Sequence, residues 1–228
     1  MNKKILLTGS TGGIGSTLAV MLLEAGHELY LPVRNIEKAK ALFFRFPNAH
    51  IEIRDLEDYD DMIEYCALCS HEGIVFDYVL LLAGDLRKDM DSMFAGETDE
   101  EKEVNSIEYH EIVNLRTAET VVFGLQKAFG EALKATTLLG VSSWAANFEP
   151  GHPYRKGEEG YVIAKAKLSK MLRDLKHESY FQDVICEEPS LIRTPLTERE
   201  FPELISDPEV VKLEPEEYVA HLRKILNL

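Results

Sequence analysis

The sequence has no long apolar run and few cysteines. No apolar stretch approaches the roughly 18 residues of a transmembrane helix, and the N-terminus runs straight into a predicted strand instead of a signal peptide. Only three of the 228 residues are cysteine, which is typical of a reducing compartment and argues against a disulfide-rich scaffold. We therefore expect a cytoplasmic protein.

Basic residues are also few. The chain has 25 Lys and Arg against 40 Asp and Glu, which gives a formal net charge of −15. No basic stripe is available to neutralise phosphates, so the composition argues against nucleic acid as a partner and, more weakly, against an anionic membrane surface. With 45% hydrophobic residues, a chain of this length can bury a sizeable core, and we expect residues 1–228 to form one domain.

One cysteine pair has the spacing of a metal or redox site. Cys66 and Cys69 are separated by two residues, and His71 follows closely. No second pair of ligands accompanies them, however, and the segment 58–71 is predicted to be a helix between two strands. Because cysteine also packs as a small hydrophobic residue in cores, we predict that no metal binds here.

Short apolar runs alternate with helical patterns along the chain. This alternation predicts a Rossmann-like α/β fold, a doubly wound parallel sheet of six strands in three layers (α/β/α). The acid-rich connection 84–103 is expected to be a solvated loop or a frayed helix start, and the last sheet edge to be free or covered by a partner. The expected strands are 3–8, 28–33, 49–53, 77–82, 136–142 and 181–187. The expected helices are 14–25, 36–45, 58–71, 104–132, 159–177 and 215–226.

A glycine-rich turn follows the first apolar run. The sequence Gly9-Ser10-Thr11-Gly12-Gly13-Ile14-Gly15 lies between a predicted strand and a predicted helix. In that setting one glycine permits a tight turn, another lets a pyrophosphate reach N–H groups at the helix N-terminus, and the last allows close helix–strand packing. The turn predicts a dinucleotide site.

The second strand indicates which dinucleotide is bound. An NAD site usually ends this strand with an acidic residue that takes the ribose hydroxyls. The segment 30–35 has no carboxylate and offers Arg34, a planar cation suited to a 2′-phosphate. A surface arginine at the start of the next helix is the alternative interpretation. The sequence favours NADP(H) over NAD(H).

Tyr161 and Lys165 carry the clearest chemical signal. Four residues apart on a predicted helix, the phenol and the ammonium fall on one face. A cation beside a phenol favours its ionised form, which suits the phenol for general acid–base work. An isolated pair of this kind is usually part of a solvated helix face, so its meaning depends on the glycine turn upstream.

The glycine turn, the Tyr-x-x-x-Lys pair and their separation resemble the short-chain dehydrogenase/reductase family over about residues 3–195. The glycine spacing fits both the shorter branch of that family and the longer, epimerase-like branch. At 228 residues the chain lacks room for the extra substrate domain of the longer branch, so we assign it to the shorter one. The resemblance implies reversible hydride transfer between a nicotinamide and a carbonyl or alcohol substrate, in a homodimer or homotetramer packed through the helices that carry Asn114 and Tyr161.

The resemblance also implies a role for each of four residues. Tyr161 would give or take the substrate proton, and Lys165 would bind the nicotinamide ribose and favour the phenolate of Tyr161. Ser143 would hydrogen-bond the substrate oxygen, with a role as a helix cap or turn residue as its alternative. Asn114 would hold a water next to Lys165, with a tolerated polar position inside a helix as its alternative.

Other positions match cofactor contacts of the family. Asp55 and Leu56 resemble the pair beside the adenine ring, and the segment 189–194 resembles the one near the nicotinamide carboxamide. The implied cofactor contacts are Gly9, Ser10, Thr11, Gly12, Gly13, Ile14, Gly15, Arg34, Asp55, Leu56, Ala83, Gly84, Tyr161, Lys165, Pro189, Ile192 and Thr194.

The chain departs from the family in three places. Leu81 and Leu82 stand where the family has two asparagines before Ala-Gly, Ser143 lies 18 residues before Tyr161, which is longer than usual, and Ser190 replaces a glycine. These departures leave a second hypothesis open, an NADP(H)-binding sensor or scaffold without turnover. An epimerase or dehydratase is disfavoured by chain length.

The substrate walls are expected around the site. They are Trp144, Phe148, Tyr154 and the segment 195–211, which hints at a partly apolar substrate. His152 is a further candidate contact, although a loop histidine is more often simply solvated.

Overall fold

The computed structural model describes residues 2–87, 93–148 and 158–228. Its strands form one parallel sheet in the order β3-β2-β1-β4-β5-β6. The predicted fold, a doubly wound sheet of six strands, is confirmed. The strands are β1 (Lys4–Thr8), β2 (Glu28–Val33), β3 (Ala49–Ile53), β4 (Tyr78–Leu81), β5 (Thr137–Val141) and β6 (Asp183–Glu187).

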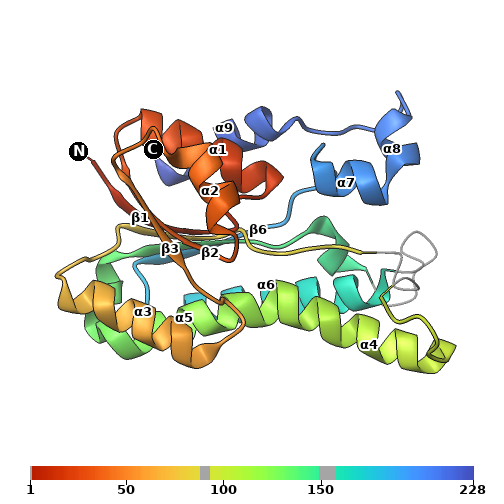
Figure 1. Cartoon of the computed structure of the whole chain (residues 1–228), viewed down its shortest axis with the longest axis horizontal. Helices are drawn as coiled ribbons and strands as arrows, with labels where there is room; N and C mark the ends of the chain where they lie inside the picture. Colours follow the sequence, from red (N-terminus) through yellow and green to blue (C-terminus); the bar gives the residue numbers. More distant parts are fainter. Residues whose placement is uncertain (1, 88–92, 149–157) are drawn as a thin grey trace.

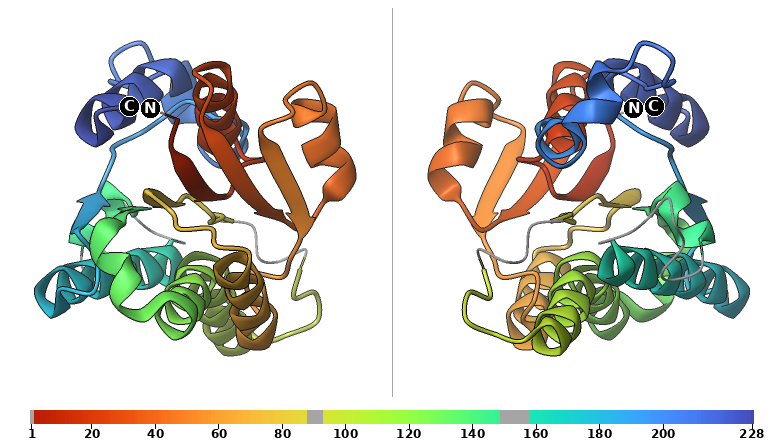
Figure 2. Two further views of the ribbon diagram at one scale, coloured as in Figure 1. Left: turned by 90° about the vertical axis from the view of Figure 1, so that its left-hand side faces the viewer. Right: turned by 90° about the vertical axis from the view of Figure 1, so that its right-hand side faces the viewer.

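Helices cover both faces of the sheet, which gives the three layers seen edge-on in Figure 1. Helices α1, α2 and α9 lie on one face, and α3, α4, α5 and α6 lie on the other (Figures 1 and 2). The helices are α1 (Gly13–Glu24), α2 (Ile36–Phe43), α3 (Tyr59–His71), α4 (Asp99–Glu111), α5 (Thr117–Phe129), α6 (Glu159–Glu178), α7 (Pro195–Glu200), α8 (Pro202–Ser206) and α9 (Pro215–Leu226). None of the described helices is long and apolar enough to span a membrane.

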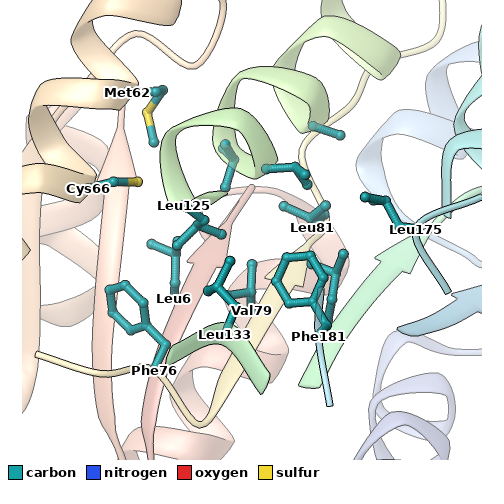
Figure 3. Packing of buried hydrophobic residues seen from close by; sticks show 14 of the residues in the cluster. Leu6, Met62, Cys66, Phe76, Val79, Leu81, Leu125, Leu133, Leu175 and Phe181 are labelled. Carbon is teal, nitrogen blue, oxygen red and sulfur yellow. The ribbon is translucent and has the colours of Figure 1, made fainter. Parts of the chain in front are cut away.

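The apolar strands separate two hydrophobic cores. Successive side chains of a strand point to opposite faces, so Leu6 joins the core under α3 and α5 while Ile5 and Leu7 join the core under α1 and α9. Figure 3 shows the first core, with Leu6, Val79 and Leu81 from the strands packed among helix side chains. Burial on both faces explains why the central strands β1, β2, β4 and β5 are nearly continuous apolar runs and not alternating ones.

The Cys66–Cys69 pair belongs to this core. Figure 3 shows Cys66 on α3 turned toward α5, and a Cβ atom added to Gly124 would lie 3.1 Å from its Sγ atom. Burial raises the pKa of the Cys66 thiol to about 12 and that of Cys69 to about 11. Both thiols are therefore protonated at neutral pH, and they pack as small apolar side chains.

Two stretches differ from the sequence prediction. The expected helix 104–132 begins earlier, at Asp99, because Thr98 and Glu101 form a capping box and three acidic residues occupy its first turn. The same helix is interrupted by a short π-helical segment, η1 (Ile112–Arg116). Helices α7 and α8 were not expected; each starts with a proline at its first position, where the missing N–H costs no hydrogen bond.

The strand order creates a crevice at the carboxyl ends of β1 and β4. From β1 the chain moves to β2 and β3 on one side, and then returns to β4 on the other side of β1. The loops after these two strands diverge at this switch point, which is where open α/β sheets bind ligands. The glycine turn follows β1 and Ala83-Gly84 follows β4, so both lie at this crevice.

Candidate active site

The glycine turn packs against the loop after β4. Gly9 has a φ of +69°, and a Cβ atom there would lie 2.7 Å from backbone atoms of Leu82 and Ala83. A Cβ atom on Gly15 would lie 2.1 Å from the carbonyl oxygen of Gly9. Only glycine fits these two positions, because one needs the left-handed conformation and both need close backbone approach.

The N-terminus of α1 is arranged for an anion. Gly12 precedes the helix and provides no side-chain cap for the first turn. Ser10 Oγ is buried and has no hydrogen-bond partner among the described residues. An uncapped helix N-terminus attracts negative charge, and an orphaned buried hydroxyl beside it is a second donor for a phosphate oxygen. The residues of the turn therefore fit a nucleotide pyrophosphate.

A cleft of about 380 Å³ extends from this turn across the ends of β2, β3 and β4. Asp55 and Gly13, both predicted as cofactor contacts, are not among its lining residues. The Asp55 side chain instead accepts a hydrogen bond from the Glu57 N–H at 2.9 Å, and a Cβ atom on Gly13 would lie 2.9 Å from Thr194 Cβ. The predicted residues that do line the cleft are Gly9, Ser10, Thr11, Gly12, Arg34, Leu56, Ala83 and Gly84.

A smaller cavity of about 130 Å³ continues from Gly84 and collects the four proposed catalytic residues. They come from three separate places: Asn114 from η1, Ser143 from the end of β5, and Tyr161 with Lys165 from α6. The fold thus brings together side chains up to 51 positions apart in the sequence. The remaining predicted residues in this cavity are Ile14, Pro189, Ile192 and Thr194.

Lys165 is buried beneath Tyr161. Its side chain is 5% exposed, and its Nζ atom lies 5.7 Å from the centroid of the Tyr161 ring. Nζ donates to the Val141 carbonyl oxygen at 3.3 Å, and no described carboxylate forms an ion pair with it. Burial lowers the pKa of Lys165 to about 8. The ammonium is poorly solvated, so a phenolate or a ribose oxygen beside it would be stabilised.

The side chain of Asn114, like that of Lys165, lies next to Gly84. Its Nδ2 atom donates to the carbonyl oxygens of Asp85 at 2.8 Å and His110 at 3.1 Å, whereas Oδ1 is buried without a partner among the described residues. A Cβ atom on Gly84 would lie 2.6 Å from that Oδ1 and 3.4 Å from Lys165 Nζ. The free amide oxygen and the ammonium therefore converge on Gly84, which is a place for a bound water or ribose hydroxyl.

Ser143 combines both roles considered from the sequence. Its Oγ accepts a hydrogen bond from the Ala145 N–H at 3.2 Å and so caps the short helix η3 (Trp144–Asn147). It also lines the small cavity beside Tyr161. A capping hydroxyl accepts one hydrogen bond and keeps its own proton for donation, so capping does not prevent contact with a substrate oxygen.

No signal in the sequence pointed to Asp85, whose carboxylate accepts hydrogen bonds from three side chains next to the site. It accepts hydrogen bonds from Tyr109 Oη at 2.7 Å, Arg87 Nε at 3.1 Å and Arg199 Nη2 at 3.3 Å. Burial opposes its charged form, but the hydrogen bonds from Tyr109 and Arg87 outweigh burial and lower the pKa of Asp85. Because Arg199 comes from α7, this carboxylate links the loop after β4 to the segment over the site.

His110 was also missed. It is fully buried, its Nδ1 lies 2.8 Å from the Ser106 carbonyl oxygen, and its Nε2 accepts from the Arg87 N–H at 3.3 Å. Burial lowers the pKa of His110 below its ordinary value, so the imidazole is uncharged at neutral pH. Its centroid lies 6.1 Å from that of Tyr161, which places it as a packing partner of the phenol ring.

A third, mostly apolar pocket of about 260 Å³ opens beside Tyr161 and Ser143. Of the expected substrate walls, Trp144 and part of the segment 195–211 line it, whereas Phe148 stacks edge-on against Trp144 at 4.8 Å. Tyr154 and His152 lie outside the described residues. The pocket is lined by Leu86, Ser143, Trp144, Tyr161, Pro189, Ser190, Leu191, Leu196, Thr197, Phe201, Leu204, Val210 and Val211.

Comparisons with known proteins concern the fold of the chain. No model of a known protein family matches the chain. A curated short-chain dehydrogenase from Gibberella zeae is 37% identical over 82 residues, which are 36% of this chain and 31% of that protein. The match therefore spans only about a third of the curated relative. Among solved structures, the closed form of serine dehydrogenase complexed with NADP+ has a TM-score of 0.79 at 18% identity, with 99% of this chain and 89% of that chain covered.

The chain has the short-chain dehydrogenase/reductase fold. The fold that the resemblance implied is confirmed. A short-chain dehydrogenase from Sphingobium yanoikuyae in complex with NADPH is similar with a TM-score of 0.74 at 21% identity, over 98% of this chain and 84% of that one. A chain described as ribose-5-phosphate isomerase from Brucella melitensis 16M is similar with a TM-score of 0.77 at 16% identity, over 100% and 88%. The fold alone therefore does not fix the reaction.

The structure shows which residues hold the loop after β4 in place of the two asparagines of the short-chain dehydrogenase/reductase pattern, which this chain lacks. Thr8 Oγ1, at the end of β1, accepts hydrogen bonds from the N–H groups of Leu82 at 3.1 Å and Ala83 at 3.2 Å. Asn114 holds the next turn through the Asp85 carbonyl oxygen at 2.8 Å. The loop after β4 is thus braced by a strand hydroxyl and a helix amide, with no asparagine of its own.

Replacing Gly84 with alanine should reduce turnover by roughly tenfold to a hundredfold, because the new Cβ atom would lie 2.6 Å from Asn114 Oδ1 and would force that oxygen to move. The thermal midpoint should change little, because Gly84 lies at the crevice and not in either core. Steady-state kinetics beside a thermal melt measure the two effects. The matched control is Gly73→Ala, where no atom lies within 4 Å but φ is +72°, so a loss of stability without a loss of activity is expected. Unchanged turnover in Gly84→Ala would remove Gly84 from the site.

Proposed function

We propose that the chain is an NADP(H)-dependent oxidoreductase that interconverts a carbonyl group and an alcohol by hydride transfer, and that residues 1–228 act as one nucleotide-binding domain. One observation carries the proposal. Tyr161, Lys165 and the free amide oxygen of Asn114 meet in a cavity that adjoins, at Gly84, the cleft of the glycine turn. Similar chains solved with NADP+ or NADPH support the choice of nucleotide.

The residues of the two cavities fit a dinucleotide along their whole length. Ser10 Oγ and the N-terminus of α1 would hold the pyrophosphate, and Arg34 with Lys38 would face the adenosine end. Asn114 Oδ1 and Lys165 Nζ would hold the ribose and a water at the other end. The nicotinamide, when bound, supplies the hydride. The protein supplies two orphaned polar atoms, Ser10 Oγ at the pyrophosphate and Asn114 Oδ1 at the nicotinamide end, and the proton chemistry beside the nicotinamide.

Tyr161 is the proton donor and acceptor in this proposal. Its phenol borders both the small cavity and the apolar pocket, so it faces the nucleotide on one side and a substrate on the other. Lys165 favours the phenolate because its ammonium is desolvated and has no described carboxylate to neutralise it. Ser143 borders the same two spaces and donates its hydroxyl proton to the substrate oxygen. The proton therefore moves between the substrate oxygen and Tyr161 Oη.

The apolar pocket supports a substrate whose carbonyl carries an alkyl or aromatic body. None of the residues that line it in the described part of the chain is charged. Its volume of about 260 Å³ lies just below the roughly 300–1,000 Å³ of typical small-molecule sites. Assembly into a homodimer or homotetramer and a cytoplasmic location stay predictions from the resemblance and the composition.

An NADPH-oxidation screen over aldehydes, ketones and quinones tests the proposal. Turnover of uncharged apolar carbonyls, and loss of that turnover in Tyr161→Phe, is the expected result. NADPH binding by calorimetry without turnover of any carbonyl would favour the sensor or scaffold hypothesis. No uptake of either nucleotide would overturn the proposed function.

A further inference from the structure

The adenosine end of the first cleft carries both signs of charge. Arg34 and Lys38 line it from the end of β2 and the first turns of α2. Glu57, in the loop between β3 and α3, lines the same end. The cleft therefore has two cations and one carboxylate where the ribose of an adenosine would lie.

Strand pairing brings Glu57 to this place. β2 and β3 are in parallel register with Val33 opposite Ile53, and the Arg54 N–H continues the ladder to the Val33 carbonyl oxygen at 3.1 Å. The loop that follows is fixed by the Asp55 side chain, which accepts the Glu57 N–H at 2.9 Å. These contacts turn the Glu57 carboxylate back toward the end of β2.

Glu57 and Arg34 form an ion pair across the cleft. Glu57 Oε1 lies 2.9 Å from Arg34 Nη1, with the arginine side chain 70% exposed and the glutamate side chain 30% exposed. Exposed pairs of this kind contribute little to stability, so either partner can exchange to a ligand. The pair is thus a contact that a bound nucleotide can open.

The two charges favour different nucleotides. A carboxylate accepts hydrogen bonds from ribose hydroxyls, as it does in NAD sites, and it repels a 2′-phosphate. A guanidinium binds a phosphate through two parallel hydrogen bonds and gains less from a hydroxyl. A 2′-phosphate that reaches Arg34 must displace Glu57 and then remain close to it, whereas a 2′-hydroxyl leaves the ion pair intact.

We propose that Glu57 is a specificity-determining residue of the nucleotide site, one that competes with a 2′-phosphate for Arg34 and accepts hydrogen bonds from ribose hydroxyls when no phosphate is present. The inference rests on the proposed function, because it requires a bound dinucleotide. It goes beyond that function because the chain would then bind NADH as well as NADPH. Its preference for NADPH over NADH would be smaller than Arg34 and Lys38 alone would give.

Calorimetric titration with NADPH and NADH tests the inference without any need for turnover. Glu57→Gln keeps the shape of the side chain and removes its charge, and it should raise the ratio of NADPH to NADH affinity by about tenfold. The matched control is Glu24→Gln, which removes the carboxylate of a similar ion pair, with Arg45 at 3.3 Å, outside the cleft. The control should leave the ratio unchanged. A complementary variant, Arg34→Ala, should lower the ratio and shift the preference toward NADH.

The outcomes separate the inference from the function on which it rests. Binding of both nucleotides with the same ratio in wild type and Glu57→Gln would overturn the role of Glu57 and leave the proposed function standing. A lower ratio in Glu57→Gln would overturn it as well, because Glu57 would then be organising Arg34 for the phosphate. Binding of neither nucleotide by wild type would overturn the proposed function and this inference together.

Discussion

Replacement of Tyr161 by phenylalanine is expected to lower kcat for carbonyl reduction by about 10²–10⁴-fold, the usual contribution of a positioned general acid. Affinity for NADPH should change little, because the phenylalanine ring keeps the contact with His110 and fills the same space. The loss is specific to the proton-transfer step. Steady-state turnover together with calorimetry of NADPH binding separates chemistry from binding.

The control for this experiment is a tyrosine that lies away from the site. Tyr180 is 46% exposed near the end of α6 and lines neither the cleft nor the two pockets at the crevice, so Tyr180→Phe should behave as wild type. Wild-type kcat in Tyr161→Phe, with the same substrate, would mean that another group supplies the proton. The proposal for Tyr161 would then be wrong.

Replacement of Lys165 by methionine is expected to stabilise the nucleotide-free protein while removing activity. The ammonium is buried and has no described carboxylate partner, so its charge opposes folding. A pKa of about 8 in place of the ordinary lysine value of 10.5 corresponds to a cost on the order of 3 kcal/mol near neutral pH. Methionine has a similar length and no charge, so Lys165→Met should unfold at higher urea concentration.

The pH dependence of the stability difference between Lys165→Met and wild type shows whether the buried charge of Lys165 is its cause. A lowered pKa means that the unfolded chain binds the proton more tightly than the folded one between 8 and 10.5. Relative to Lys165→Met, the wild type is therefore most stable above the pKa that Lys165 has in the unfolded chain. It loses stability as the pH falls toward the pKa that Lys165 has in the folded chain. The difference in stability between Lys165→Met and wild type should accordingly be small near pH 10.5, the ordinary pKa of lysine, and complete below about pH 8.

Urea unfolding of both proteins across this pH range measures this difference. Lys167→Met is the matched control, because Lys167 is exposed on the same helix and pairs with Glu111. That change should alter stability by only about 0.5 kcal/mol. If Lys165→Met is less stable than wild type at every pH, the hydrogen bond to the Val141 carbonyl oxygen outweighs the desolvation of the ammonium.

The fold could be read from the sequence because its signals are local. The central strands β1, β2, β4 and β5 are short apolar runs buried on both faces, and the turns between strands and helices have glycine or a capping residue within a few positions. Tyr161 and Lys165 share a helix face by their spacing alone. The prediction did not include the π-helical segment at Asn114, which packs against α6, because hydrophobic periodicity does not distinguish such a segment from the helix around it.

The site could be predicted only as a set of residues. The sequence alone determined the alternation of strands and helices, the glycine turn that only glycine can form and the shared helix face of Tyr161 and Lys165, because each depends on neighbours within a few positions. The tertiary structure decided that Glu57 reaches Arg34, that Thr8 braces the loop after β4, and that Asp85 joins that loop to α7. These contacts link residues 23 to 114 positions apart. They exist because parallel strands gather their carboxyl ends at one edge, and a side chain's partner there is set by sheet order and not by distance along the chain.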